Sequence, residues 1–184
     1  MQSNNQENVV LCDQRGRPSG VKEKLAAHLD GDLHIAFSVM VVRYSVQGPE
    51  YFLQQRAEHK YHSGGLWSNT VCSHPRKGEL IAAAALRRMG EELGCFEPLR
   101  FKSLGHIVYR AELGNGLIEH EFDHILLAEG PLLDVLPNPD EVSACRWWQE
   151  AEIEQALATS PERFTAWFSK VFNKARENLV ESVE

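Results

Sequence analysis

Hydrophobic and β-branched residues fall in short runs that are separated by turn-forming segments, and this pattern predicts a sheet. Residues 35–43 are β-branched and aromatic, residues 47–49 (QGP) turn the chain, and residues 51–56 return it, so a hairpin is expected there. Residues 14–20 (QRGRPSG) are rich in turn formers and predict a loop. Further strands are expected at residues 9–12, 103–109, 118–128 and 142–148.

The strongest helix prediction covers residues 79–93. Leu86, Met89 and Leu93 recur at helical spacing and predict an apolar stripe facing the core, and Gly94 is suited to ending the helix. Two more helices are expected at residues 150–158 and 161–178. The elements together predict an α+β protein of the α/β/α kind, in which helices flank a mixed sheet.

Composition fits one soluble domain spanning residues 1–184, with residues 1–8 expected to be flexible. Those first residues are polar and lack the basic and apolar regions of a signal peptide, and no apolar run is long enough to span a bilayer. Four widely spaced cysteines without a C-x-x-C pair predict reduced thiols in a cytoplasmic protein.

The formal net charge of −7 argues against binding to nucleic acid, because the long-range field repels a polyanion. The same field opposes any phosphate-bearing substrate. Such a substrate therefore requires metal ions or a local cluster of basic side chains.

An acidic cluster lies in the strand expected at residues 118–128. Side chains alternate along a strand, so Glu119, Glu121 and Asp123 share one face, with neighbours roughly 7 Å apart. A solvated polar face is the ordinary explanation of such a cluster. Phe122 and the apolar residues 125–127 predict a buried strand instead, and buried carboxylates need a cation, which favours metal ligation.

Three histidines near predicted turns, His28, His34 and His74, are candidate partners for these carboxylates. A single histidine is more often structural, but a site of imidazole nitrogens and carboxylate oxygens suits Mn, Zn or Fe. Cys72 lies beside His74 on a strand-to-helix connection, where it is either a reactive thiolate or a small buried hydrophobe. The spacing alone favours neither.

The charged residues on the predicted helix also have two possible explanations. Arg88 and Glu92 lie at i and i+4, as do Arg87 and Glu91. A surface salt bridge explains each pair, and so does a carboxylate for magnesium beside a guanidinium for phosphate. Trp147 and Trp148 are expected to pack in the core. No functional role is predicted for the remaining histidines, which are His59, His62, His106, His120 and His124.

Four segments in order carry a resemblance to a known family: residues 23–28 (EKLAAH), 33–38 (LHIAFS), 67–75 (WSNTVCSHP) and 119–124 (EHEFDH). Together they resemble type 1 isopentenyl-diphosphate isomerases, over residues 9–172. That family has the Nudix fold, and residues 79–94 stand where its Nudix box belongs. Ser73 replaces the opening glycine of the hydrolase box and Arg88 replaces a glutamate, which weakens the case for diphosphate hydrolysis.

The resemblance implies a site for each part of the reaction. One divalent ion (Mn²⁺, Mg²⁺ or Zn²⁺) would be held by the ligands His28, His34, His74, Glu119 and Glu121. A magnesium ion would bridge the substrate diphosphate to Glu92 and to the backbone carbonyl of Cys72. The diphosphate-facing basic residues would be Lys24, Arg56, Lys60 and Arg88.

The same resemblance assigns the proton transfers. Glu121, with Tyr109, and Cys72 would exchange protons with a prenyl diphosphate, and the ring of Trp167 would face the carbocation. The expected protein is a monomer or a homodimer. A Nudix pyrophosphohydrolase acting on a nucleoside or prenyl diphosphate is the main alternative, and a catalytically silent metal-binding domain is a second.

Overall fold

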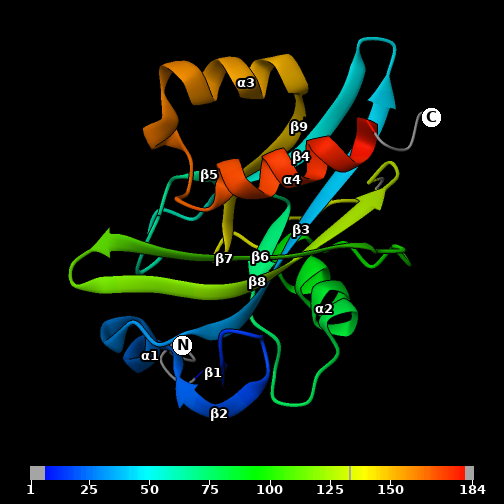
Figure 1. Cartoon of the computed structure of the whole chain (residues 1–184). Helices are drawn as coiled ribbons and strands as arrows, with labels where there is room; N and C mark the ends of the chain where they lie inside the picture. The colour runs from blue at the N-terminus through cyan, green and yellow to red at the C-terminus, as the bar shows by residue number, and fades with distance from the viewer. Residues whose placement is uncertain (1–6, 133, 181–184) are drawn as a thin grey trace.

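The computed structural model describes residues 7–132 and 134–180. These residues form one nine-stranded sheet and four α-helices (Figure 1). The strands are β1 (Asn8–Cys12), β2 (Pro18–Glu23), β3 (His34–Ser45), β4 (Gly48–Arg56), β5 (Trp67–Ser68), β6 (Val71–Ser73), β7 (Lys102–Gly114), β8 (Leu117–Glu129) and β9 (Val142–Gln149). The helices are α1 (Lys24–Asp30), α2 (Ile81–Leu93), α3 (Glu150–Thr159) and α4 (Phe168–Val180), with a 3₁₀ turn at Pro161–Arg163.

Strand β3 is the centre of the sheet. It runs parallel to β8, with His34 opposite Glu121, and antiparallel to β4 and β6, with Ser38 opposite Cys72. Strand β9 extends the sheet beyond β4, and β7 extends it beyond β8. This register brings Cys72 and Glu121, which are distant in the sequence, to the same end of β3 as His34.

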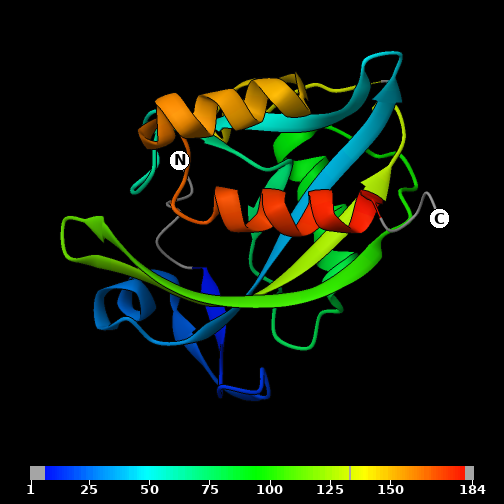
Figure 2. The same ribbon diagram turned by 45° about the horizontal axis from the view of Figure 1, so that its top comes forward.

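Helices cover both faces of the sheet, with α2 on one side and α3 and α4 on the other (Figures 1 and 2). Alternation along β3 sends Phe37, Val39 and Val41 toward α2, and Met40 and Val42 toward α4. Both sets are fully buried. The near-continuous apolar sequence of β3 follows from this, because a strand covered on both faces has no solvated side.

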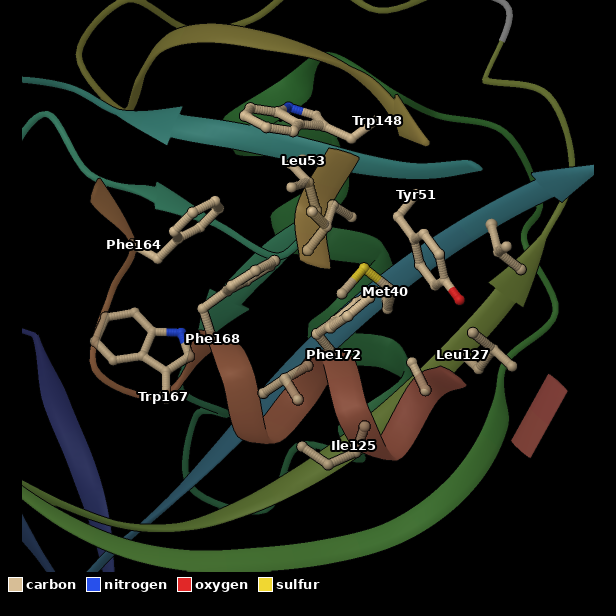
Figure 3. Close-up of a cluster of buried hydrophobic side chains, with 14 of the residues drawn as sticks. Met40, Tyr51, Leu53, Ile125, Leu127, Trp148, Phe164, Trp167, Phe168 and Phe172 are labelled. Atoms are coloured by element: carbon tan, nitrogen blue, oxygen red, sulfur yellow. The ribbon is translucent and has the colours of Figure 1, made fainter. Parts of the chain in front are cut away.

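Aromatic rings fill the core between α4 and the sheet (Figure 3). Phe168 stacks against Phe164 with ring centroids 4.7 Å apart, and Phe172 meets Tyr51 edge-on at 5.1 Å. Trp167 ends this row of rings and is 1% exposed. The row therefore connects the packing of α4 to the position of the Trp167 indole.

Most predicted elements are confirmed, including the β3–β4 hairpin, the β7–β8 hairpin and the end of α2 at Gly94. The loop predicted at residues 14–20 is wrong in its last part, because residues 18–20 belong to β2 and pair with β1. The apolar stripe of α2 is also misplaced. Leu86 is 40% exposed, because the buried arc is centred on Ala85 and Met89 and Leu86 lies at its margin.

The helix predicted over residues 161–178 is wrong, because the chain breaks between the 3₁₀ turn and α4. Phe164 is extended and bridges to Trp67, and the Thr165 amide donates to the Trp67 carbonyl at 2.9 Å. The break turns Trp167 into the core. Trp148 packs there as expected, and Trp147 packs partly buried on the α2 side.

Residues 1–6, most of the segment expected to be flexible, lie outside the described residues, and Asn8 already belongs to β1. A single domain over residues 1–184 stays a prediction. None of the described helices is both long and apolar enough to cross a membrane.

Replacing Phe172 with alanine should lower the free energy of unfolding by about 3–5 kcal/mol, because it leaves a cavity among packed rings. Urea denaturation measures this change. Phe96, which is 85% exposed, is the matched control, and its alanine variant should stay within about 0.5 kcal/mol of the unaltered protein. Equal losses in the two variants would contradict the assigned core.

Candidate active site

Two histidines reach the site from the short helix α1 and the start of β3. The Glu23 side chain caps α1 by accepting from the Leu25 and Ala26 amides, and Gly31, in the left-handed region with φ +68°, ends it. The sequence reading expected only a loop between His28 and His34. Helix α1 positions the His28 ring and β3 positions the His34 ring, and the two ring centroids lie 5.0 Å apart in fully buried side chains.

Backbone carbonyls set the protonation of these two rings. His28 Nδ1 lies 2.7 Å from the Lys24 carbonyl, and His34 Nδ1 lies 2.9 Å from the Asp32 carbonyl. A carbonyl oxygen can only accept, so each Nδ1 carries the proton. Each Nε2 then keeps its lone pair on the side that faces the carboxylates of β8.

The β8 carboxylates are buried, as the apolar residues of that strand predicted: Glu119 is 2% exposed, and Glu121 and Asp123 are fully buried. Glu121 Oε1 lies 3.0 Å from His74 Nε2 and 3.5 Å from His34 Nε2. Its other oxygen accepts a 2.6 Å hydrogen bond from the Tyr109 hydroxyl. Tyr109 is opposite Glu121 in the antiparallel pair of β7 and β8.

Burial and charge act differently on the three carboxylates. Burial raises the pKa of Glu119 well above its usual range, and the neighbouring charge of Glu121 raises it further. The pKa of Asp123 is raised for the same two reasons. Burial also opposes ionisation of Glu121, but its contacts with His34 and His74 outweigh burial and hold the pKa of Glu121 well below normal.

A divalent cation fits this group of side chains. The donor atoms of His28, His34 and His74 lie within 4.8 Å of one another. Among the described residues, His28 Nε2, His34 Nε2 and Glu119 Oε2 are buried without a hydrogen-bond partner. Unpartnered buried nitrogen lone pairs next to carboxylates are what a divalent cation would satisfy.

Cys72 is held at the site by two side chains of the same segment that do no chemistry themselves. Thr70 Oγ1 donates to the Phe52 carbonyl at 2.6 Å and accepts from the Val41 amide at 2.8 Å. Asn69 Nδ2 donates to the Val71 carbonyl at 2.6 Å. Both side chains therefore tie the β5–β6 segment between β3 and β4.

The Cys72 thiol is partly exposed and lines the cavity that also contains Glu121. Burial and the charge of Glu121 raise its pKa well above the usual range, so the thiol is protonated in the metal-free protein. Opposite Cys72 on β3, the Ser38 hydroxyl donates to Asp123 at 2.8 Å. Asp123 thus has a partner of its own beside the thiol.

A second group of charges surrounds Glu92 on α2, which is 4% exposed. Glu92 accepts from Arg88 at 2.7 Å and from Gln54 Nε2 at 2.8 Å. Glu141 contacts Arg88 at 3.3 Å and also pairs with Lys60. The sequence reading missed Glu141, because nothing in the loop before β9 distinguishes it from a surface acid.

Arg56 differs from Lys24, Lys60 and Arg88, each of which pairs with a carboxylate. Arg56 Nε is buried, and within the described ranges it has no hydrogen-bond partner. One terminal nitrogen of Arg56 donates to the His62 carbonyl at 3.4 Å, and the guanidinium lies 5.8 Å from the Trp167 ring centre. The Lys24 ammonium lies 3.2 Å from Glu7. A guanidinium without a carboxylate suits an incoming anion.

A cavity of about 140 Å³ joins the two groups. Ten of the residues predicted for the site line it: Lys24, Arg56, Lys60, Cys72, His74, Arg88, Glu92, Glu119, Glu121 and Trp167. His28, His34 and Tyr109 lie behind this wall and touch its carboxylates. Tyr61 and His62 also line the cavity, although the sequence predicted no role for either.

Known proteins share this fold and this sequence. Residues 33–168 match the NUDIX domain family. The chain is 54% identical to an isopentenyl-diphosphate Delta-isomerase of Photobacterium profundum, over 90% of this chain and 92% of that protein. It is 49% identical to an isopentenyl-diphosphate Delta-isomerase of Aliivibrio fischeri, over 94% of this chain and 97% of the relative.

Two solved structures share the fold at low identity. DR0079 from Deinococcus radiodurans has a TM-score of 0.73 at 15% identity, over 92% of this chain and 99% of that chain. The NUDIX domain of Shewanella oneidensis NrtR, complexed with ADP ribose, has a TM-score of 0.62 at 18% identity, over 79% and 87% of the two chains. The chain therefore belongs to the NUDIX family. Within that family its sequence groups with relatives that bear the name isopentenyl-diphosphate Delta-isomerase.

Without metal, the protein should lose stability as the pH rises through the raised pKa of Glu119. The folded state binds that proton more tightly than the unfolded chain does, so its contribution is present below the ordinary carboxyl pKa and is lost above the folded one. Replacing Glu119 with glutamine should remove this loss. In denaturant titrations of chelator-treated protein, the stability of the variant relative to the unaltered protein should increase from pH 5 to pH 8.

The control for this experiment is Glu112→Gln on β7, whose side chain is 79% exposed. Its stability relative to the unaltered protein should not depend on pH. A Glu119→Gln difference that stays flat between pH 5 and pH 8 would contradict the raised pKa.

Proposed function

We propose that the chain is an isopentenyl-diphosphate Delta-isomerase, which interconverts isopentenyl and dimethylallyl diphosphate. The main support is the arrangement around Glu121. Its carboxylate contacts two histidines and the Tyr109 hydroxyl, and it lines the same cavity as the Cys72 thiol. The name shared by relatives that are 49–54% identical agrees with the function expected from the sequence.

The reaction needs two proton-transfer groups. A proton adds to the terminal alkene carbon, the π electrons form the new C–H bond, and a tertiary carbocation results. Loss of a proton from C2 then supplies the electron pair of the new double bond. We assign Glu121 with Tyr109 to the first transfer and Cys72 to the second, and each group serves in reverse because the reaction is reversible.

The pKa directions sharpen this assignment. In the metal-free cavity Glu121 is ionised and the Cys72 thiol is protonated. Glu121 can donate first only if the bound cation and substrate reverse this order of proton affinities. The assignment of Glu121 to the first proton transfer therefore requires that cation and substrate binding reverse the proton affinities of Glu121 and Cys72.

The proposed metal ligands are His28, His34, His74, Glu119 and Glu121. A Mn²⁺, Mg²⁺ or Zn²⁺ ion bound there would supply positive charge that orients Glu121 and tunes its acidity. We assign a second ion, magnesium, to Glu92 and the Cys72 carbonyl, where it would offset charge on the substrate diphosphate.

The proposed diphosphate-binding residues are Lys24, Arg56, Lys60 and Arg88, which line the same cavity as Cys72 and Glu121. The Trp167 ring is assigned to face the carbocation, a contact worth about 2 kcal/mol when desolvated. A monomeric or homodimeric state and a cytoplasmic location stay predictions of the sequence.

Diphosphate hydrolysis is the competing function. Its case is weakened at Arg88, which stands where the hydrolase box has a glutamate and instead pairs with Glu92. Incubation with isopentenyl diphosphate and magnesium separates the possibilities. Dimethylallyl diphosphate without released phosphate supports the isomerase, released phosphate supports a hydrolase, and tight metal binding without turnover supports a silent domain.

Replacing Cys72 with alanine, or Glu121 with glutamine, should lower kcat on the order of 10²- to 10⁴-fold, because each removes a proton-transfer group. Deuterium incorporation from heavy water into substrate and product then shows which transfer each variant has lost. Cys145→Ala on β9 is the control for loss of a thiol, and it should retain activity. Full activity of either site variant would reject its assigned role.

Replacing Arg56 with glutamine should lower kcat/KM on the order of 10- to 100-fold, because charge-assisted hydrogen bonds contribute about 1.5–3 kcal/mol. Steady-state kinetics with isopentenyl diphosphate measure the change. Arg15→Gln, in the exposed turn after β1, removes the same charge away from the cavity and should leave kcat/KM unchanged. Equal losses of kcat/KM in the two variants would mean that the overall charge of the protein, and not the position of Arg56 in the cavity, determines the effect.

A further inference from the structure

His62 lies at the metal site although no functional role was expected for it. The side chain is buried at 8% exposure, and its donor atom lies within 4.8 Å of donor atoms of both His28 and Glu119. The His62 ring stacks on the His28 ring, with centroids 5.6 Å apart and planes inclined by 28°. His62, from the loop between β4 and β5, thus lies close to both His28 and Glu119.

The loop between β4 and β5 holds His62 in this position. The Gly65 amide donates to the Arg56 carbonyl at 3.0 Å, and Arg56 in turn donates to the His62 carbonyl at 3.4 Å. A Cβ on Gly64 would stand 2.4 Å from the Glu58 carbonyl oxygen, so the loop accepts only glycine there. Ser63 has φ +53°, an unfavourable angle for a residue with a side chain, which the surrounding bonds maintain.

Whether His62 could belong to a separate metal site depends on how many ions the His28 ring can bind. Two donor groups share His28: one contains His34 and His74, and the other contains His62 and Glu119. Because His28 Nδ1 is engaged by the Lys24 carbonyl, only Nε2 can bind a metal, and one lone pair binds one ion. The two groups therefore cannot hold separate ions through His28. Their donor atoms do not all lie within 4.8 Å of one another, so one ion would have to draw His62 toward His34 and His74.

We propose that His62 is a further ligand of the ion held by the five residues assigned above. His62 Nδ1 lies 3.2 Å from the Ser63 hydroxyl, which can accept its proton and leave the Nε2 lone pair for the metal, as in His28 and His34. Six donors, four imidazoles and two carboxylates, suit an octahedral transition-metal ion better than magnesium, which prefers oxygen ligands. This proposal relies on the proposed function only in taking the cavity as a metal site.

The test uses the full chain, stripped of metal with a chelator and then titrated with Co²⁺. X-ray absorption of the Co²⁺ protein should count four imidazoles in the unaltered protein and three in His62→Ala. The Co²⁺ dissociation constant of the variant should rise on the order of 10- to 100-fold. His62→Gln keeps an oxygen donor, so its count should also fall to three while its affinity stays between the other two.

His106→Ala is the matched control, because His106 is exposed on β7 away from the cavity, and it should keep both the count and the affinity. Circular dichroism of each metal-free variant establishes that it folds. An unchanged imidazole count and affinity in both His62 variants would overturn the proposal, as would a rise in KM for isopentenyl diphosphate with metal binding unaltered. The imidazole count and the Co²⁺ affinity need no turnover, so an inactive isomerase would leave the ligand result standing.

Discussion

The burial of three carboxylates on one face of β8 is the constraint around which the site is built. Glu121 and Asp123 pair with the central strand, and Glu119 precedes them on the same face of β8; all three are buried, where ionised oxygens have lost their water. One Asp123 oxygen accepts from Ser38, and Glu121 contacts Tyr109 and histidines, but one oxygen of Glu119 and one of Asp123 have no hydrogen-bond partner among the described residues. In the metal-free protein the raised pKa of Glu119 lets a bound proton remove its charge, and a bound cation would offset that charge once Glu119 is ionised.

The most specific motif of the sequence, residues 67–75, combines structural and chemical residues. Asn69 and Thr70 hydrogen-bond to backbone groups of β3, β4 and β6, and Asn69 also accepts from the Trp167 indole at 3.2 Å. These bonds determine where Cys72 and His74 enter the cavity. One short segment therefore fixes the relative positions of the thiol, a proposed metal ligand and the indole that ends the aromatic row.

Structural features that follow from local periodicity could be predicted correctly from the sequence. Alternation along β8 places Glu119 and Glu121 on one face, and the fold that the resemblance implies is confirmed. Features that depend on contacts between residues far apart in the sequence were not predicted. The break at Phe164 depends on a bridge to Trp67, and His62 and Glu141 come from loops whose sequences resemble ordinary surface turns. Helix α1 has only seven residues, too few for a clear periodic signal.

The charges around Glu92 bear on how the proposed diphosphate and magnesium would bind, and they favour binding of the two together. Lys60 and Arg88 are engaged by Glu92 and Glu141, so neither is free to bind phosphate while those carboxylates lack another cation. A magnesium ion at Glu92 would release Arg88 and carry the diphosphate at the same time. Arg56, which has no carboxylate partner among the described residues, is then the base available for the first contact with the anion. Charge balance thus predicts that the metal–diphosphate complex binds better than either component alone.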